Sequence, residues 1–206
     1  MNMVLYKKLT VSYADELQYQ MQHAFTTLLQ GKLKLNSTAS IEHIKNKTYH
    51  DLTIEDLPIA SHVDKDVFID SIPLFKQFLN DFNLEVYLIT LLAICNDMGI
   101  HCDLSQPYET YHDFLLNPPT IRSAIIFPVY HTNYSKTVFY KPKFEATYYK
   151  SNIGKVISFD KNDVDEIDNF IVDDIYALRV DVPHGVTKYD TTPRVVYSVK
   201  FKTNVL

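Results

Sequence analysis

Short strand-like runs recur through the second half of the chain, and their spacing limits the possible fold more than any other feature. The runs are rich in β-branched, aliphatic and aromatic residues and are separated by turn signals such as Asn152 and Gly154. They cover residues 86–95, 121–130, 137–141, 144–149, 155–159, 174–182 and 194–201. Several short strands at such spacing are typical of an antiparallel sandwich or barrel.

The first eighty-odd residues have helical patterns instead. Ser12 and Asp15 have the spacing of a capping box, and the apolar positions that follow share one helix face as far as Leu29. Gly31 is a stop signal after this helix. A second helix is predicted to begin at Ile72. The expected fold class is therefore α+β, mainly β with N-terminal helices packed on one face of the strands.

The length predicts one domain over residues 1–206, because a chain of this size can bury a substantial core without being divided. Residues 1–85 are expected to form a mainly helical support and residues 86–206 the β core. A hydrophobic content of 46% and a charged content of 22% are those of a soluble globular protein.

Charge and cysteine usage exclude several classes of protein. A net charge of −5 gives no indication of a nucleic-acid partner. Cys95 and Cys102 form no disulfide framework, which favours a reducing cytoplasm. A run of eighteen apolar residues is absent, so the sequence predicts no membrane span.

Two histidines and one aspartate in the β-rich half form a candidate metal site. His101 and Asp103 are two residues apart, so on a strand both project from one face while Cys102 points away. His184 supplies a distant third ligand. Two imidazoles and one carboxylate can occupy one face of octahedral Fe(II) and leave three positions open for a co-substrate and dioxygen.

Arg194 follows His184 by ten residues. We expect His184 to end one strand of a hairpin and Arg194 to start the next, so that the two lie opposite each other, about 5 Å apart at Cβ. A guanidinium there can hold the far carboxylate of a dicarboxylic co-substrate bidentately, as a lysine cannot.

A second His-x-Asp motif competes with the first. His62 and Asp64 have the same spacing, but they lie in the charged stretch from 61 to 70, which is typical of a loop or a helix entry. The copy at 101 follows the long apolar run 86–95 and precedes another strand-like run, so it is the favoured site.

Residues 86–201 resemble the double-stranded β-helix, or jelly-roll, core of the Fe(II)/2-oxoglutarate-dependent oxygenases, in particular small members encoded by bacteriophages and bacteria. Four blocks carry the resemblance, namely Gly99-Ile100-His101-Cys102-Asp103, Arg122-Ser123-Ala124-Ile125-Ile126-Phe127-Pro128, Val182-Pro183-His184-Gly185-Val186 and Pro193-Arg194-Val195-Val196-Tyr197-Ser198-Val199-Lys200-Phe201.

The resemblance implies a dioxygenase that uses Fe(II), 2-oxoglutarate and O2, hydroxylates a substrate, and releases succinate and carbon dioxide. It implies that His101, Asp103 and His184 bind the iron and that Arg194 binds the C5 carboxylate of 2-oxoglutarate. Ser198 lies on the same strand face and is a candidate to assist Arg194. Many relatives place this hydroxyl two residues after the arginine, where this chain has valine.

The stretch from Leu104 to Thr120 is longer than the connection usual in these relatives and is rich in aromatic residues, so it is predicted to form a movable cover over the site. Two other functions remain open at this stage. One is a jelly-roll module that binds a ligand or partner without turnover, and the other is a cupin-like metalloenzyme that uses no oxo-acid. The residue that separates them from the oxygenase is Arg194, which neither alternative requires.

Overall fold

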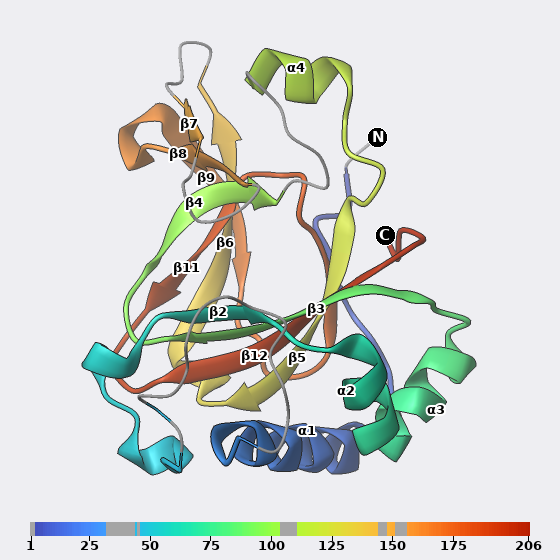
Figure 1. Ribbon diagram of the computed structural model, residues 1–206. Coiled ribbons are helices and arrows are strands. Elements are labelled where there is room, and N and C mark those ends of the chain that lie inside the picture. Colours follow the sequence, from blue (N-terminus) through green and yellow to red (C-terminus); the bar gives the residue numbers. More distant parts are fainter. Residues whose placement is uncertain (1–2, 32–43, 45, 104–110, 144–147, 151–155) are drawn as a thin grey trace.

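The computed structural model describes residues 3–31, 44, 46–103, 111–143, 148–150 and 156–206. Two six-stranded antiparallel sheets face each other, and helices cover the outside of one of them (Figure 1). None of the helices in these ranges is long and apolar enough to cross a membrane.

The first sheet carries the helices. Its strands, in spatial order, are β1 (Tyr6–Lys8), β10 (Tyr176–Arg179), β5 (Ser123–Tyr130), β12 (Arg194–Phe201), β3 (Val86–Ile94) and β2 (Ile59–His62). Both of its edge strands thus come from the N-terminal part of the chain, which was expected to be mainly helical.

The second sheet lies across the interior from the first. Its strands, in spatial order, are β7 (Tyr148–Lys150), β8 (Val156–Phe159), β4 (Met98–Asp103), β11 (His184–Lys188), β6 (Ser135–Pro142) and β9 (Val164–Phe170). From β3 to β6, and again from β9 to β12, consecutive strands alternate between the two sheets. This alternation is the winding of a double-stranded β-helix, and it confirms the predicted jelly roll.

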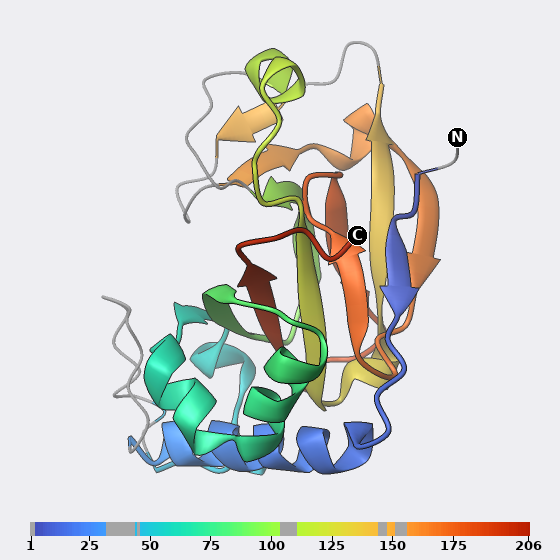
Figure 2. The same cartoon turned by 90° about the vertical axis from the view of Figure 1, so that its right-hand side faces the viewer.

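Three helices pack on the outer face of the first sheet: α1 (Ala14–Leu29), α2 (Lys65–Ser71) and α3 (Pro73–Asp81) (Figure 2). A short helix, α4 (Tyr111–Leu116), follows β4. In the described ranges, 3-10 turns lie at Tyr49–Asp51, Ile54–Asp56, Thr132–Tyr134 and Lys161–Asp163.

Helix α1 begins differently from the prediction. Its N-cap is Tyr13, whose side chain makes no capping hydrogen bond, so the expected capping box at Ser12 and Asp15 is wrong. The predicted stop is confirmed, because Gly31 adopts a left-handed φ of 70°. The predicted second helix is α3, where Pro73 occupies the first turn and needs no hydrogen-bond partner for its nitrogen.

Strand β12 divides its side chains between two environments. Val195, Tyr197, Val199 and Phe201 join the core under the helices, and all four are fully buried. The alternate residues, beginning with Arg194, face the space between the sheets, where Val196 belongs to a second core cluster. Because β12 pairs with β3 on one side and β5 on the other, its register is held from both sides.

Candidate metal centre

Strand β4 presents His101 and Asp103 to the interior, as the two-residue spacing predicted. Cys102 points to the opposite face, where it packs in a cluster with residues such as Ile100 and Ile157. His184 begins β11 and is paired directly with His101 across the two strands. Adjacent strands of one sheet therefore bring the two histidines together, with ring centroids 4.6 Å apart.

Among the described residues, His101, Asp103 and His184 form a group able to hold a metal ion, with one ligand atom from each lying within 4.8 Å of the others. Ligand atoms about 2.1 Å from an octahedral ion lie about 3 Å apart on one face, and Oδ1 of Asp103 is already 3.4 Å from Nε2 of His101. The two imidazoles and the carboxylate suit a first-row divalent ion such as Fe(II).

Backbone carbonyls orient both histidines in the same way. The Nδ1 atom of His101 lies 2.7 Å from the carbonyl oxygen of Gly99, and that of His184 lies 2.9 Å from the carbonyl oxygen of Val182. A carbonyl only accepts, so each Nδ1 carries the hydrogen and each Nε2 presents its lone pair to the interior.

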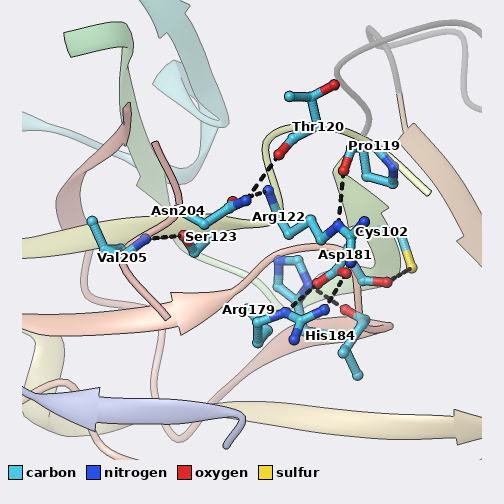
Figure 3. Close-up of polar contacts among 11 residues, drawn as sticks. Cys102, Pro119, Thr120, Arg122, Ser123, Arg179, Asp181, His184, Asn204 and Val205 are labelled. Atoms are coloured by element: carbon cyan, nitrogen blue, oxygen red, sulfur yellow. Dashed lines mark hydrogen bonds and ion pairs between the residues drawn. The ribbon is translucent and has the colours of Figure 1, made fainter. Parts of the chain in front are cut away.

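The segment from 180 to 183 leads into His184 and is fastened to its neighbours. Asp103 donates its backbone N–H to the carbonyl of Val180 at 2.8 Å. The thiol of Cys102 lies 3.6 Å from the carbonyl oxygen of Asp181, whose carboxylate pairs with Arg179 (Figure 3). Cys102, which points away from the metal-binding group, thus helps to position His184 through this contact. The sequence did not reveal the contact.

Burial and neighbouring charges set the protonation of the site. Burial lowers the pKa of His184 to about 4, and the charge of His101 acts in the same direction, so His184 is neutral and able to bind a metal. Burial also opposes the charge on His101, but the hydrogen bond and charge of Asp103 raise its pKa. The Asp103 carboxylate therefore favours a positive charge at Nε2 of His101, which either a proton or a metal ion can supply.

Lys200 contacts this group from the facing sheet. Its Nζ lies 3.0 Å from Oδ2 of Asp103, while Oδ1 of Asp103 lies 3.4 Å from Nε2 of His101. Burial would raise the pKa of Asp103, but the Lys200 ammonium, followed by His101, holds it well below its usual range. Sequence reasoning missed Lys200, although it stands six residues after Arg194 and hence on the same strand face.

Arg194 is buried between the sheets with an exposed fraction of 3%. Its Nε has no hydrogen-bond partner, and burial lowers its pKa to about 10 without an opposing contribution from a carboxylate of the described residues. Nearby Asp190 is already engaged, since its carboxylate lies 2.8 Å from His131 and 3.6 Å from Lys188. Arg194 is thus a buried cation that lacks a counter-ion among the described side chains.

The expected hairpin between His184 and Arg194 is wrong. His184 starts a strand that continues to Lys188, and this strand pairs with β4 and β6. Arg194 starts β12 in the other sheet, where it pairs with Ile94. The residues with turn signals lie at 189–193, after β11, and form the connection from β11 in one sheet to β12 in the other. The two residues meet the interior from opposite sheets instead of lying opposite each other on one ladder.

Three other sequence predictions concerned Ser198, the second His-x-Asp motif and the cover over the site. Ser198 is buried on the same face of β12 as Arg194, with its Cα roughly 13 Å further along the strand. His62 and Asp64 serve the fold: His62 Nδ1 lies 3.3 Å from the hydroxyl of Thr90, and Asp64 caps α2. Residues 104–110 of the predicted cover lie outside the described residues, and α4 follows them.

Comparison with known proteins supports the fold. A scan of protein-family models finds no match, and neither does a search of the curated proteins. The epimerase SnoN, solved in complex with Fe3+, alpha ketoglutarate and nogalamycin RO, aligns with a TM-score of 0.55 and 9% identity over 96% of this chain and 78% of SnoN. A prolyl-4-hydroxylase from Pseudomonas putida aligns with a TM-score of 0.45 and 9% identity over 97% of this chain and 92% of the hydroxylase. At such identity the likeness to SnoN concerns the fold alone.

Proposed function

We propose that this protein is an Fe(II)- and 2-oxoglutarate-dependent oxygenase that hydroxylates an unidentified substrate. The observation that carries the proposal is the buried guanidinium of Arg194, which lacks a carboxylate partner among the described residues and faces the same interior as His101, Asp103 and His184. An unpaired buried charge is costly, so its presence is best explained by an anionic ligand that enters the interior.

The metal-binding group fits Fe(II). Two imidazole nitrogens and one carboxylate oxygen are the protein ligands that non-haem iron oxygenases use, and they leave positions open for small molecules. The locked tautomers of His101 and His184 direct both Nε2 atoms inward, as a shared ion requires.

The position of Arg194 fits the far end of a dicarboxylate whose near end chelates the ion. Arg194 and the metal-binding group both face the space between the sheets, and a planar guanidinium binds a carboxylate through two parallel hydrogen bonds. Ser198 shares this face, and we propose that its hydroxyl meets the co-substrate nearer to the ion, since it stands further along β12.

When bound, iron and 2-oxoglutarate supply an oxidant from O2, with release of succinate and carbon dioxide. The residues of the chain provide geometry and a dry interior. Phe139 is fully buried, with its ring centroid 6.2 Å from that of His184, and Val182 and Val196 pack in the same cluster. These apolar side chains exclude water beside the ligands and strengthen every charge interaction there.

The structural comparison supports the choice of cofactors, because SnoN shares the fold and was solved with Fe3+ and alpha ketoglutarate.

We also propose that residues 1–206 form one domain. A single core cluster supports this, since it joins Leu17 of α1 and Phe75 of α3 to the outer face of the first sheet. Cys95 and Cys102 are both free and buried, which supports a cytoplasmic location.

An anaerobic titration tests the proposal. Purified protein is mixed with Fe(II) and then with 2-oxoglutarate, and the weak visible charge-transfer band of the chelate is recorded. Wild-type protein is expected to develop the band at one equivalent of each and then to release succinate in air. Protein that binds Fe(II) but neither binds nor consumes 2-oxoglutarate contradicts the proposal and leaves a jelly-roll module without turnover.

A further inference from the structure

Lys200 forms an ion pair with one oxygen of a proposed metal ligand, Asp103. It stands near the end of β12, on the face that also bears Arg194 and Ser198, and its side chain is only 15% exposed. Its Nζ reaches across the interior to Oδ2 of Asp103 at 3.0 Å. The contact joins the two sheets beside the metal-binding group.

The two oxygens of Asp103 have different partners as a result. Oδ1 lies 3.4 Å from Nε2 of His101 and faces the other ligand atoms, whereas Oδ2 belongs to the ion pair with Lys200. An ammonium group on the second oxygen repels a metal ion and competes with it for that oxygen, so the ion pair favours coordination through Oδ1 alone. Asp103 is therefore prepared as a monodentate ligand.

The number of oxygens that Asp103 donates decides what else can bind. An octahedral ion has six positions, and two histidines with one carboxylate oxygen leave three of them open. A 2-oxoglutarate chelate needs two of these and dioxygen needs the third. If Asp103 bound through both oxygens, as carboxylates often do, the chelate would fill the last open positions.

We propose that Lys200 is a positioning residue that keeps Asp103 monodentate and so preserves a coordination position for dioxygen once 2-oxoglutarate is bound. The inference rests on the proposed function. It also predicts an unusual combination of effects, because removing Lys200 takes a repelling cation away from the ion and frees a second oxygen for it. Fe(II) binding should then become tighter, while dioxygen can no longer bind once 2-oxoglutarate is in place.

The test uses nitric oxide as a stand-in for dioxygen, read by electron paramagnetic resonance on the anaerobic Fe(II) protein. Lys200→Met is compared with wild type, with and without 2-oxoglutarate. The variant should bind Fe(II) on the order of tenfold more tightly by calorimetric titration. Its nitrosyl signal should match wild type without 2-oxoglutarate and fall at least about fivefold, on the order of 1 kcal/mol, when 2-oxoglutarate is bound.

Matched variants separate positioning from other roles. Lys200→Arg keeps a cationic donor and should restore the nitrosyl signal. Lys202→Met removes the exposed lysine two residues on, which pairs with Glu85, and should behave as wild type. Lys200→Gln, which is uncharged and one atom shorter than lysine, should reproduce Lys200→Met, and it serves in its place should the methionine variant fold poorly.

Two outcomes overturn the inference while the proposed function survives. One is a full nitrosyl signal from Lys200→Met with 2-oxoglutarate bound, and the other is weaker Fe(II) binding by that variant, which would show that Lys200 merely supports the ligand. The failure of the proposed function looks different, because wild-type protein would then bind no Fe(II) or no 2-oxoglutarate in the same titrations.

Discussion

Replacing Arg194 with methionine should stabilise the protein when no ligand is bound and weaken its response to 2-oxoglutarate. Burial lowers the pKa of Arg194 from its ordinary value to about 10. At about 1.4 kcal/mol per tenfold change, this corresponds to about 3 kcal/mol of unfavourable desolvation. At pH 7 the guanidinium is charged in the folded and unfolded states alike, so the whole penalty opposes folding.

Methionine fills less space than arginine, which offsets part of the gain. We expect a net increase in the free energy of unfolding of about 1–2 kcal/mol, and hence a rise in Tm of about 2–8 °C for a chain of this length. The measurement is thermal unfolding by circular dichroism in the presence of a chelator.

The ligand should reverse the comparison. Loss of the guanidinium should weaken 2-oxoglutarate binding about ten- to a hundredfold, with Arg194→Lys between wild type and Arg194→Ala. At a hundred times the wild-type Kd, 2-oxoglutarate with anaerobic Fe(II) stabilises wild type by about 2.7 kcal/mol, but a hundredfold weaker variant by only about 0.4 kcal/mol. A methionine variant that is less stable without ligand, and that gains as much from 2-oxoglutarate as wild type does, would refute the reasoning.

Three further predictions concern the binding of Fe(II) and 2-oxoglutarate. His101→Ala should lose Fe(II) binding by calorimetry while its far-ultraviolet circular dichroism is retained, and His62→Ala should bind as wild type does; the opposite pattern would identify the wrong motif. Gly185→Ala should weaken Fe(II) binding and lower the free energy of unfolding by about 1–2 kcal/mol, because a Cβ at this position lies 3.0 Å from the Met98 carbonyl oxygen. In Gly99→Ala the added Cβ has no atom within 4 Å, so this control should have little effect in the same calorimetric titration and thermal unfolding experiment. Ser198→Ala should raise the Kd for 2-oxoglutarate by about two- to tenfold with no change in Fe(II) affinity, since the loss of one neutral hydrogen bond costs about 0.5–1.5 kcal/mol.

Local patterns predicted the elements whose two faces differ clearly. Residues 194–201 alternate between the two environments without interruption, and the predicted strand has the same bounds as β12. The His-x-Asp spacing likewise predicted the shared face of His101 and Asp103, because projection from a strand depends only on neighbouring residues.

Features that depend on partners far along the chain were missed. Strands β1 and β2 are short edge strands without an apolar pattern in the sequence. The residues of β1 are mostly exposed, and β2 has only two buried residues, of which Ser61 is polar. Strand β9 has five consecutive exposed residues between Val164 and Phe170 and resembles a loop in sequence. The contact between Lys200 and Asp103 joins facing sheets, and spacing within one strand cannot reveal it.

The divided faces of β12 also constrain how this protein can change over evolutionary time. Deleting one residue within the strand would shift everything beyond it by one place, moving charged or hydroxyl side chains under the helices and fully buried residues such as Tyr197 or Phe201 toward the ligands. One such deletion would disrupt the hydrophobic core and the ligand-binding face of β12 at the same time. Length variation among descendants of this chain should therefore collect in the connections between strands, and β12 should keep a constant length even where its residues differ.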